Sequence, residues 1–343
     1  MTGVPHNRIL IGDVRRELRR LPAGSVDTVI TSPPYYLLRD YGIDGQLGLE
    51  PSVHEWVDEL RLVMRGVARV LKPTGSLWLN LGDSYSRHPR FGGPSKSLLL
   101  GPERLVLALV ADGWIVRNKL IWAKTNSMPN SVRDRFACTW EVIYFLVRSR
   151  KYFFDLDAAR VPVRSSPPRA SGHATSGSSS RPAWAGRLAG SNSGLANMKA
   201  AGRIGHPLGK NPGDVITTAA SNYRGAHFAT FPEVLIERPL VAGCPERVCR
   251  RCGRPWERQS VDRNLRVASL GQLQSSCSCR AEWRPGLVLD PFFGSGTVGL
   301  VAERLHRDWL GIELNPGFAR LAEQRIGQQR PKVGRDGSQP RAA

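Results

Sequence analysis

The chain has 343 residues, a length that favours about two domains, and 41% of them are hydrophobic, enough for a sizeable core. It has no apolar run of about 18 residues and no apolar segment in residues 1–8, so we predict neither a membrane span nor a secretory signal and expect a cytoplasmic protein. Lysine and arginine number 49 against 29 acidic residues, and the net charge of +20 favours a polyanionic partner, although a genome that uses arginine freely would give the same excess.

Short apolar stretches alternate with segments of helical periodicity along the first half of the chain. We predict strands at residues 8–11, 27–31, 76–81, 114–122 and 141–147, and helices at residues 14–21, 53–71 and 102–112. Alternation of this kind is typical of an α/β fold with a parallel-type sheet. Residues 1–161 are therefore assigned to the N-terminal half of one α/β domain.

The strand predicted at residues 27–31 ends in Ser32, Pro33, Pro34 and Tyr35. Ligands of open α/β sheets bind at the carboxyl ends of such strands. The two prolines fix their φ angles and hold main-chain carbonyls rigidly, so that these can accept hydrogens from an exocyclic amino group and make its nitrogen more nucleophilic. Tyr35 offers a face on which a flipped base can stack. Taken alone, the same residues also fit a plain polyproline turn.

The stretch between Ala158 and Gly213 has no acidic residue and is rich in serine, glycine, proline and alanine. Its basic residues are Arg160, Arg164, Arg169, Arg181, Arg187, Lys199, Arg203 and Lys210. A segment of this composition cannot bury enough apolar surface to order itself. We predict a basic low-complexity loop or target-recognition region at residues 162–224, which either lies on DNA phosphates or is a solvated linker. The tail at residues 328–343 is predicted to be disordered.

A second motif follows the strand predicted at residues 287–290. It consists of Asp290, Phe292, Phe293, Gly294, Ser295, Gly296 and Thr297, and it opens a helix predicted at residues 297–305. The next strand, at residues 308–313, ends in Glu313, 19 residues after Gly294, where an acidic group can meet ribose hydroxyls. Asp290 would repel a pyrophosphate but suits the ammonium group of S-adenosylmethionine, so we favour this cofactor over a dinucleotide. A glycine turn without a ligand is the remaining alternative.

A helix predicted at residues 316–326 nearly completes the chain, although a nucleotide-binding sheet needs further strands after this point. Such strands are present at the N-terminus, beginning with residues 8–11. We therefore predict a circularly permuted Rossmann-like sheet, with residues 225–327 as its cofactor-binding half.

Four of the six cysteines form two close pairs, Cys249 with Cys252 and Cys277 with Cys279. Two pairs of thiolates suit a structural, tetrahedral zinc ion. Reduced thiols without metal are the alternative, and a disulfide ranks last in a cytoplasmic chain. Zinc at this place would fold a knuckle insertion at residues 246–283, whose arginines could face DNA.

The chain resembles the β-class of DNA amino-methyltransferases, in which the Pro-Pro-Tyr motif precedes the cofactor loop. The likeness rests on residues 11–13, 25–27, 31–35, 140–141, 152–155, 209–214, 227–232 and 290–297. It implies a sheet that binds S-adenosylmethionine, with Phe231 and Pro232 in the cofactor pocket and Asp13 near the cofactor adenine. It also implies that the basic stretch after Arg160 is the target-recognition region.

The resemblance implies site-specific methylation of double-stranded DNA, and it associates Ser32 with cytosine-N4 as the target. A hydroxyl can donate to the ring acceptors of cytosine, whereas an ionised aspartate only accepts. Adenine-N6 methylation is an alternative, and so is a non-catalytic DNA-binding zinc protein with a degenerate methyltransferase fold. Methylation of carbon-5 is disfavoured because it needs a cysteine after a proline, and this chain has only Cys244 before Pro245. A cognate restriction endonuclease is a further potential partner, and the sequence leaves the oligomeric state open.

Overall fold

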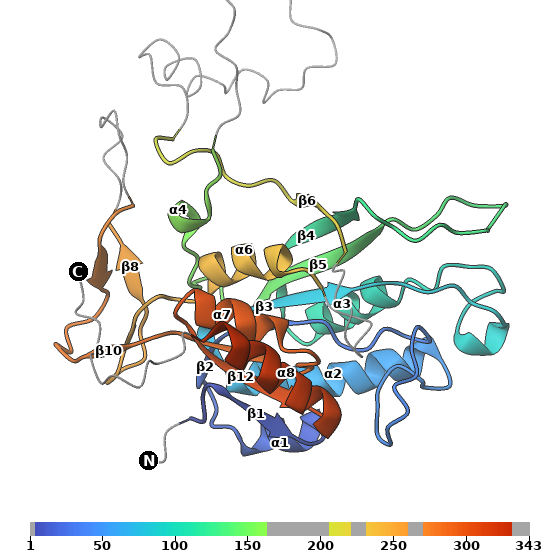
Figure 1. Ribbon diagram of the computed structural model, residues 1–343, viewed down its shortest axis with the longest axis horizontal. Helices are drawn as coiled ribbons and strands as arrows, with labels where there is room; N and C mark the ends of the chain where they lie inside the picture. Colours follow the sequence, from blue (N-terminus) through green and yellow to red (C-terminus); the bar gives the residue numbers. More distant parts are fainter. Residues whose placement is uncertain (1–3, 163–205, 221–230, 260–269, 331–343) are drawn as a thin grey trace, which may run out of the picture. The chain divides into compact units, whose positions relative to one another are not determined.

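The computed structural model describes residues 4–162, 206–220, 231–259 and 270–330 (Figure 1). The chain divides into two compact units, residues 1–155, 213–257 and 273–343 being the larger and residues 156–212 and 258–272 the smaller. In the smaller unit, α4 (Leu156–Ala159) precedes a β-bridge between Val161 and Lys210. Most of the predicted basic region and the tail beyond residue 330 lie outside the described residues. Within the described part, no helix has the length and apolar character needed to cross a membrane.

An eight-stranded sheet forms the centre of the larger unit, in the order β1-β12-β11-β2-β3-β5-β4-β6. Its strands are β1 (Arg8–Ile11), β2 (Val26–Thr31), β3 (Leu71–Leu81), β4 (Ile115–Lys124), β5 (Trp140–Val147), β6 (Val215–Thr218), β11 (Leu287–Asp290) and β12 (Asp308–Glu313). Neighbouring strands pair in parallel except β5, which is antiparallel to both β3 and β4. This mixed sheet with its helices confirms the predicted α/β fold.

Strands from the two ends of the chain lie side by side in this sheet. β11 pairs with β2, where Leu289 is opposite Val29, and β12 pairs with β1, where Leu310 is opposite Arg8. β2 is buried along its whole length, as expected for a parallel strand that is covered on both faces. The loops after β1, β2, β11 and β12 consequently open at one edge of the sheet. This arrangement brings the Ser-Pro-Pro-Tyr and glycine motifs together.

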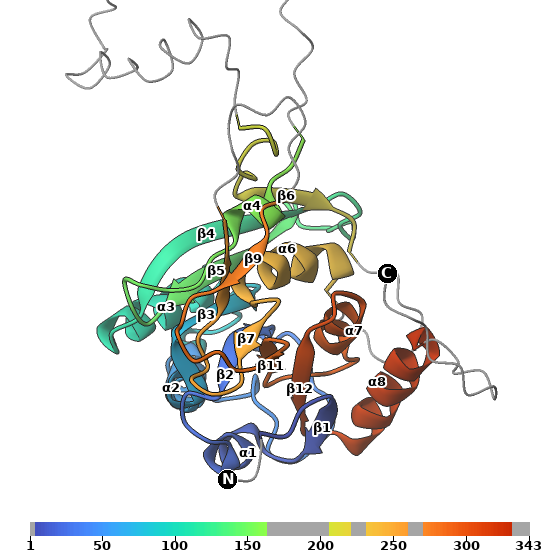
Figure 2. The ribbon, with the colours of Figure 1, turned by 90° about the vertical axis from the view of Figure 1, so that its left-hand side faces the viewer.

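Helices cover both faces of the sheet (Figure 2). One face carries α1 (Val14–Arg20), α2 (Val53–Val70) and α3 (Gly101–Ala111), and the other carries α6 (Glu233–Gly243), α7 (Thr297–Arg304) and α8 (Pro316–Gln329). The chain also has a short 3-10 helix, η1 (Pro89–Phe91). Each face is thus closed by its own hydrophobic cluster.

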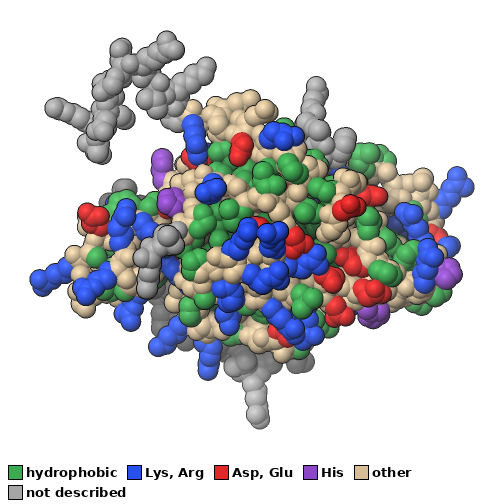
Figure 3. Space-filling model, turned by 90° about the horizontal axis from the view of Figure 1, so that it is seen from below, with side chains coloured by type: hydrophobic (Ala, Val, Ile, Leu, Met, Phe, Trp, Pro, Cys, Tyr) green, Lys and Arg blue, Asp and Glu red, His purple; other side chains and the backbone are tan. Residues whose placement is uncertain are grey.

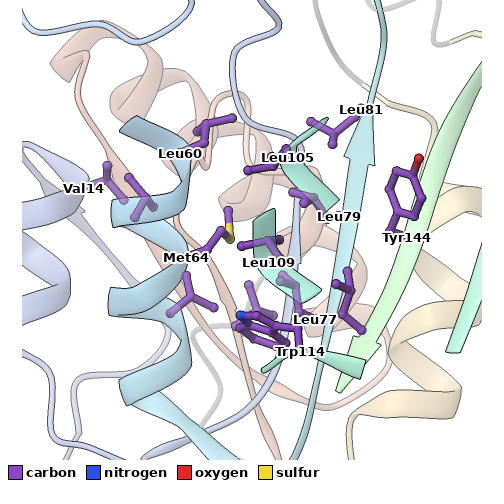
Figure 4. Packing of buried hydrophobic residues seen from close by; sticks show 14 of the residues in the cluster. Val14, Leu60, Met64, Leu77, Leu79, Leu81, Leu105, Leu109, Trp114 and Tyr144 are labelled. Atoms are coloured by element: carbon purple, nitrogen blue, oxygen red, sulfur yellow. The ribbon is translucent and has the colours of Figure 1, made fainter. Parts of the chain in front are cut away.

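The first cluster shows how sequence pattern fixes packing. Apolar residues of α2 recur every three or four positions, so one stripe of the helix, including Leu60 and Met64, is buried. Figure 4 shows these two side chains meeting Leu105 and Leu109 of α3 beside β3. The Ser52 hydroxyl caps α2 by accepting from the Glu55 N–H, a contact type that contributes about 1 kcal/mol.

Three boundaries differ from the prediction. β3 begins at Leu71, directly after α2, rather than at residue 76. β6 lies inside the region predicted as a loop and pairs with β4, with Trp122 opposite Ile216. α8 continues to Gln329, so the tail begins later than predicted. In each case backbone pairing or helix continuation extends an element into residues whose composition alone indicates a loop.

A small insertion lies between α6 and β11, where the cysteine knuckle is predicted. Its strands β7 (Val248–Cys249) and β10 (Trp283–Arg284) pair antiparallel. β8 (Trp256–Arg258) and β9 (Leu273–Ser275) form a second two-stranded ribbon. Residues 260–269 lie outside the described part of the chain.

Candidate active site

A pocket of about 300 Å³ lies at the carboxyl edge of the sheet. Its walls come from the loops after β1, β2, β11 and β12, together with residues at the ends of β3, β4 and β5. The predicted site residues that line it are Asp13, Ser32, Pro33, Pro34, Tyr35, Phe231, Phe292, Phe293, Gly294, Ser295, Thr297 and Glu313. Pro232, Asp290 and Gly296 are not among the residues that line the pocket. The structure therefore gathers most, but not all, of the predicted site in one hollow.

Glu313 anchors the glycine loop. Its carboxylate accepts from the Gly294 N–H at 2.7 Å and from the Asn315 N–H at 2.8 Å. Burial raises the pKa of this carboxyl above its ordinary value, while the backbone hydrogen bonds oppose that shift. The group lies at the end of β12 and faces the pocket, where it can also accept hydrogen bonds from a ligand.

The glycines of this loop serve close packing. Gly296 has φ of +77° and begins α7, where a Cβ would lie 2.8 Å from the Ala322 side chain. The ring of Phe293 lies against Gly311 of β12, where a Cβ would come within 2.4 Å of the ring, and stacks on Trp309 at 5.2 Å. Phe293 is therefore mainly a core residue, although it also contributes to the pocket wall.

Asp290 lies beneath the pocket rather than in its wall. Its carboxylate accepts from the Thr31 hydroxyl at 2.7 Å and from the Phe292 N–H at 3.0 Å. Only 1% of the residue is exposed, and this burial raises its pKa to about 7. The side chain is enclosed by its own loop and β2, and the predicted contact between Asp290 and a cofactor ammonium stays a prediction. The carboxylate joins the ends of β2 and β11.

Asp13 is both a helix cap and a pocket residue. Its carboxylate accepts from the N–H groups of Arg15 and Arg16, which begin α1, at 2.8 and 3.2 Å. The Arg15 guanidinium lies 2.7 Å away, and its hydrogen bond is the main reason that the pKa of Asp13 is lowered. The side chain is therefore ionised and held in place at the pocket rim.

Aromatic side chains line the same pocket. Phe231, Phe292, Tyr41 and Phe318 all contribute to its walls, and the last two meet edge to face at 6.2 Å. Pro232 is the N-cap of α6 and holds the start of this helix beside Phe231. A planar heterocycle would find apolar walls here, with carboxylates at the rim.

Tyr35 is fixed by a group of polar side chains that the sequence did not reveal. Its hydroxyl donates to Glu141 Oε2 at 2.6 Å and accepts from Asn80 Nδ2 at 2.6 Å. Lys124 Nζ donates to the other oxygen of Glu141. Burial, followed by the Glu141 charge, holds the pKa of Tyr35 well above its usual value, so the phenol keeps its hydrogen.

These hydrogen bonds also decide the orientation of Ser32. The Ser32 and Tyr35 hydroxyl oxygens are 3.1 Å apart, and Asn80 Nδ2 lies 3.3 Å from Ser32 Oγ. Because the only hydroxyl hydrogen of Tyr35 is committed to Glu141, Ser32 must donate to Tyr35. Ser32 also lines the pocket beside Tyr35. The donor role toward a base that is expected from the sequence stays a prediction.

The loop geometry refines the expected role of the prolines. The Pro34 carbonyl accepts from the indole N–H of Trp56 at 3.0 Å, which fixes the turn against α2. The ring of Tyr35 lies over Gly82, where a Cβ would come within 2.6 Å of the ring. The Pro34 carbonyl therefore already accepts a hydrogen bond from within the protein.

Three residues of this site are not predicted from the sequence to be functional groups. Asn80 is the one polar residue in the apolar run at residues 77–81, which is a signal that could have found it. Glu141 begins the strand predicted at residues 141–147 and belongs to the resemblance at residues 140–141, and Lys124 lies just beyond the strand predicted at residues 114–122. Their roles depend on pairing between β4 and β5, where Trp122 is opposite Glu141.

The four predicted metal ligands come together away from this pocket. The sulfurs of Cys249, Cys252, Cys277 and Cys279 lie within 4.8 Å of one another. The Gly253 carbonyl beside them accepts from Lys72 Nζ at 3.0 Å, near the amino end of β3. The knuckle thus lies at the edge of the sheet opposite the pocket, which argues against the expectation that its arginines face DNA bound at the pocket.

Comparison with known proteins gives consistent results. A family model described as DNA methylase matches residues 26–324. The type II methyltransferase M.XycI of Xanthomonas campestris pv. cyanopsidis is 34% identical over 94% of this chain and 88% of its own length. M.SmaI of Serratia marcescens is 32% identical over 94% of this chain and 91% of its own length.

Solved structures share the fold. The PvuII DNA methyltransferase, described as cytosine-N4-specific, has a TM-score of 0.57 at 19% identity, covering 94% of this chain and 87% of its own. A DNA modification methylase from Thermus thermophilus, solved in complex with S-adenosyl-L-methionine, has a TM-score of 0.52 at 21% identity, covering 95% of each chain.

Proposed function

The chain belongs to the N6/N4 DNA methylase family, and we propose that it methylates the exocyclic amino group of cytosine at N4, within a specific site in double-stranded DNA. The observation that carries this proposal is the pocket in which the Ser-Pro-Pro-Tyr turn meets the glycine loop. The adenine amino group at N6 is the alternative target, since the same turn can receive either base. Ser32 supports cytosine through the family association noted above.

S-adenosylmethionine is the proposed cofactor, and it would supply an electrophilic methyl group on a sulfonium. Glu313 and Asp13 both line the pocket, where Glu313 would accept hydrogen bonds from the ribose hydroxyls and Asp13 would lie near the adenine. Phe231 and Phe292 offer apolar faces to the heterocycle. Glu313 and Asp13, two of the carboxylates that line the pocket, would repel a pyrophosphate, which supports this cofactor over a dinucleotide.

The target base would enter beside the same loop. Tyr35 provides the stacking face, because its ring is pinned at the hydroxyl by Glu141 and supported below by Gly82. Ser32 Oγ and the Pro33 carbonyl would accept the two amino hydrogens and shift the nitrogen toward a tetrahedral, nucleophilic form. A base that has left the duplex stack can reach these groups, whereas a paired base cannot.

The proposal also covers the order of the chain's parts, a second cofactor and the location. The cofactor module, β11 to β12, comes late in the chain yet pairs with β1 and β2, which supports a circularly permuted order. We keep the division into residues 1–161, 162–224 and 225–327. Zinc at the four cysteines is the second proposed cofactor. The cytoplasm is the proposed location, because the proposed DNA substrate would be met there.

Duplex DNA is the proposed macromolecular partner, and the type II relatives support a cognate restriction endonuclease as a second one. Figure 3 shows Lys and Arg side chains at many places on one face of the molecule, with Asp and Glu between them. This distribution suits contacts with phosphates, which fix a protein on DNA without reading its sequence. Recognition of the target sequence then requires base contacts from other residues.

Transfer of a labelled methyl group from S-adenosylmethionine to duplex DNA tests the proposal. The wild-type chain should label DNA, and Tyr35→Ala should slow labelling at least tenfold while calorimetric affinity for the cofactor stays the same. A wild-type chain that binds NADH tightly and leaves DNA unlabelled would contradict the proposal.

A further inference from the structure

The cysteine cluster has the dimensions of a metal site. Its four sulfurs lie within 4.8 Å of one another, and each of the four residues carries a free thiol. Tetrahedral zinc thiolates have Zn–S distances of about 2.3 Å, which puts their sulfurs about 3.8 Å apart. Small side-chain movements are therefore enough to close the cluster around one ion.

The backbone around the first pair has the turn that such a site needs. Gly253 follows Cys252 with φ of +72°, and its N–H donates to the Cys249 carbonyl at 2.9 Å. Glycine adopts this left-handed conformation without strain. Pairing of β7 with β10 places Cys249 opposite Trp283. The chain that follows the second cysteine pair therefore comes back beside the first pair.

The insertion has little else to hold it together. Among its described residues, 246–259 and 270–283, the buried ones are Val248, Cys249 and Pro255. So small an apolar core does not offset the conformational entropy lost on folding, and small folds of this kind depend on a metal or on disulfides. A metal serves this purpose while the thiols stay reduced.

A buried ion pair connects the insertion to the sheet. Lys72 Nζ lies 2.6 Å from Asp27 Oδ1 and donates to the Gly253 carbonyl at 3.0 Å. The other oxygen of Asp27 accepts from the Leu287 N–H at 3.0 Å, at the start of β11. The side chains of Lys72 and Asp27 are only 11% and 3% exposed. Such a pair is favourable only when its other hydrogen-bonding groups have partners, and the knuckle supplies one of them.

We infer that Cys249, Cys252, Cys277 and Cys279 hold one zinc ion that keeps the Gly253 carbonyl on Lys72. The ion thereby stabilises the amino ends of β2 and β11, two strands whose carboxyl ends carry the catalytic turn and the glycine loop. Its role is structural, because four protein thiolates leave no coordination position open.

Elemental analysis of the full-length chain is the first test. We expect about one zinc per chain, and we expect Cys252→Ser and Cys277→Ser to lose it. Cys138→Ser is the matched control, because Cys138 is an exposed thiol outside the cluster and its replacement should leave the zinc in place. A folded wild-type chain that contains no zinc and takes up none when zinc is added would overturn the inference.

Removal of zinc from the wild-type chain tests its coupling to the sheet, without a variant that could fail to fold. A strong chelator should lower the Tm by several degrees, and added zinc should restore it. Lys72→Met should keep the zinc but lower the Tm, because Asp27 loses its buried partner. An unchanged Tm after complete removal of zinc would refute the structural role and leave the methyltransferase proposal untouched.

Discussion

Glu141 holds the hydroxyl of Tyr35, and Lys124 holds the other side of the same carboxylate. We predict that Glu141→Gln lowers kcat about tenfold or more, because an amide is a weaker acceptor and leaves Lys124 without its charged partner; hydrogen bonds to charged groups contribute about 1.5–3 kcal/mol. Cofactor affinity should change little, since Glu141 contacts Tyr35, the proposed stacking face for the base. Single-turnover kinetics and calorimetric titration separate the two effects.

Glu103 provides a matched control for that substitution. Its carboxylate also contacts one lysine and one tyrosine, at 2.7 Å from Lys119 Nζ and 3.2 Å from the Tyr144 hydroxyl, but it does not line the pocket. Glu103→Gln should therefore leave kcat near the wild-type value. Equal losses of kcat in both variants would show that Glu141 acts through general stability rather than by positioning Tyr35.

Asp290 makes stability depend on pH in a specific direction. Its pKa is raised from 3.8 to about 7 in the folded chain, so the folded state holds a proton that the unfolded state has lost between these values. This contribution to stability is present at low pH and declines as pH rises toward 7, by at most about 1.4 kcal/mol per pH unit.

Asp290→Asn should remove that dependence, because the amide oxygen can still accept from Thr31 and Phe292 but no proton is taken up. The variant should gain Tm relative to the wild type between pH 5 and about 8, in the absence of cofactor. Thermal unfolding at several pH values measures this difference. A difference in Tm that does not change with pH would show that Asp290 is ionised throughout.

The sequence indicates the residues of the two loops because prolines, glycines and a strand-end acid have direct backbone or charge consequences. It does not indicate Asn80, Lys124 and Glu141 as one group, because their contact arises only when β3, β4 and β5 pair. The same limit applies to Asp290, whose position at a strand end is correctly expected but whose side-chain direction depends on Thr31 of a distant strand.

At the scale of elements, β12 packs closely against the glycine loop because Gly311 has no side chain. A Cβ at Gly311 would come within 2.4 Å of the Phe293 ring, in the core of the unit. We predict that Gly311→Ala destabilises the fold by about 1–3 kcal/mol, typical of overpacking, and weakens cofactor binding by moving Phe293 and Gly294. Denaturant unfolding and cofactor titration check the two parts.

Gly327→Ala is the control for this substitution. Gly327 lies in α8, where an added Cβ would meet no atom within 4 Å. Alanine is favoured over glycine in a helix by about 0.5–1 kcal/mol, so this variant should be slightly more stable than the wild type. Destabilisation of both variants to the same extent would contradict the packing account.

Elements whose apolar residues recur at regular spacing are predicted well from the sequence. Short strands that form only by pairing with another strand are not. The helix at residues 53–71 is predicted to within one residue because its apolar stripe is long and regular. β6 is missed because it is a four-residue strand whose hydrogen bonds come from β4. The β7 to β10 strands, with two or three residues each, are shorter still, and only the cysteines of this segment indicate its structure from the sequence.

At the scale of the whole molecule, the two edges of one sheet serve different purposes. The carboxyl edge holds the pocket, with the Ser-Pro-Pro-Tyr turn from the first part of the chain and the glycine loop from the last part. The amino edge holds the buried Lys72–Asp27 pair and the cysteine cluster. β2 and β11 run between these edges, so the proposed metal and the proposed reaction can be tested separately on the same chain.

Mass spectrometry of nucleosides is the most direct test of the proposed reaction. Unmethylated duplex DNA is incubated with the full-length chain and S-adenosylmethionine and then digested to nucleosides, with a Tyr35→Ala sample as the control. We predict N4-methylcytosine in the wild-type sample and much less of it in the control. N6-methyladenine alone would contradict the choice of base, and the absence of both modified nucleosides from the wild-type sample would contradict the assignment of this pocket to amino-group methylation.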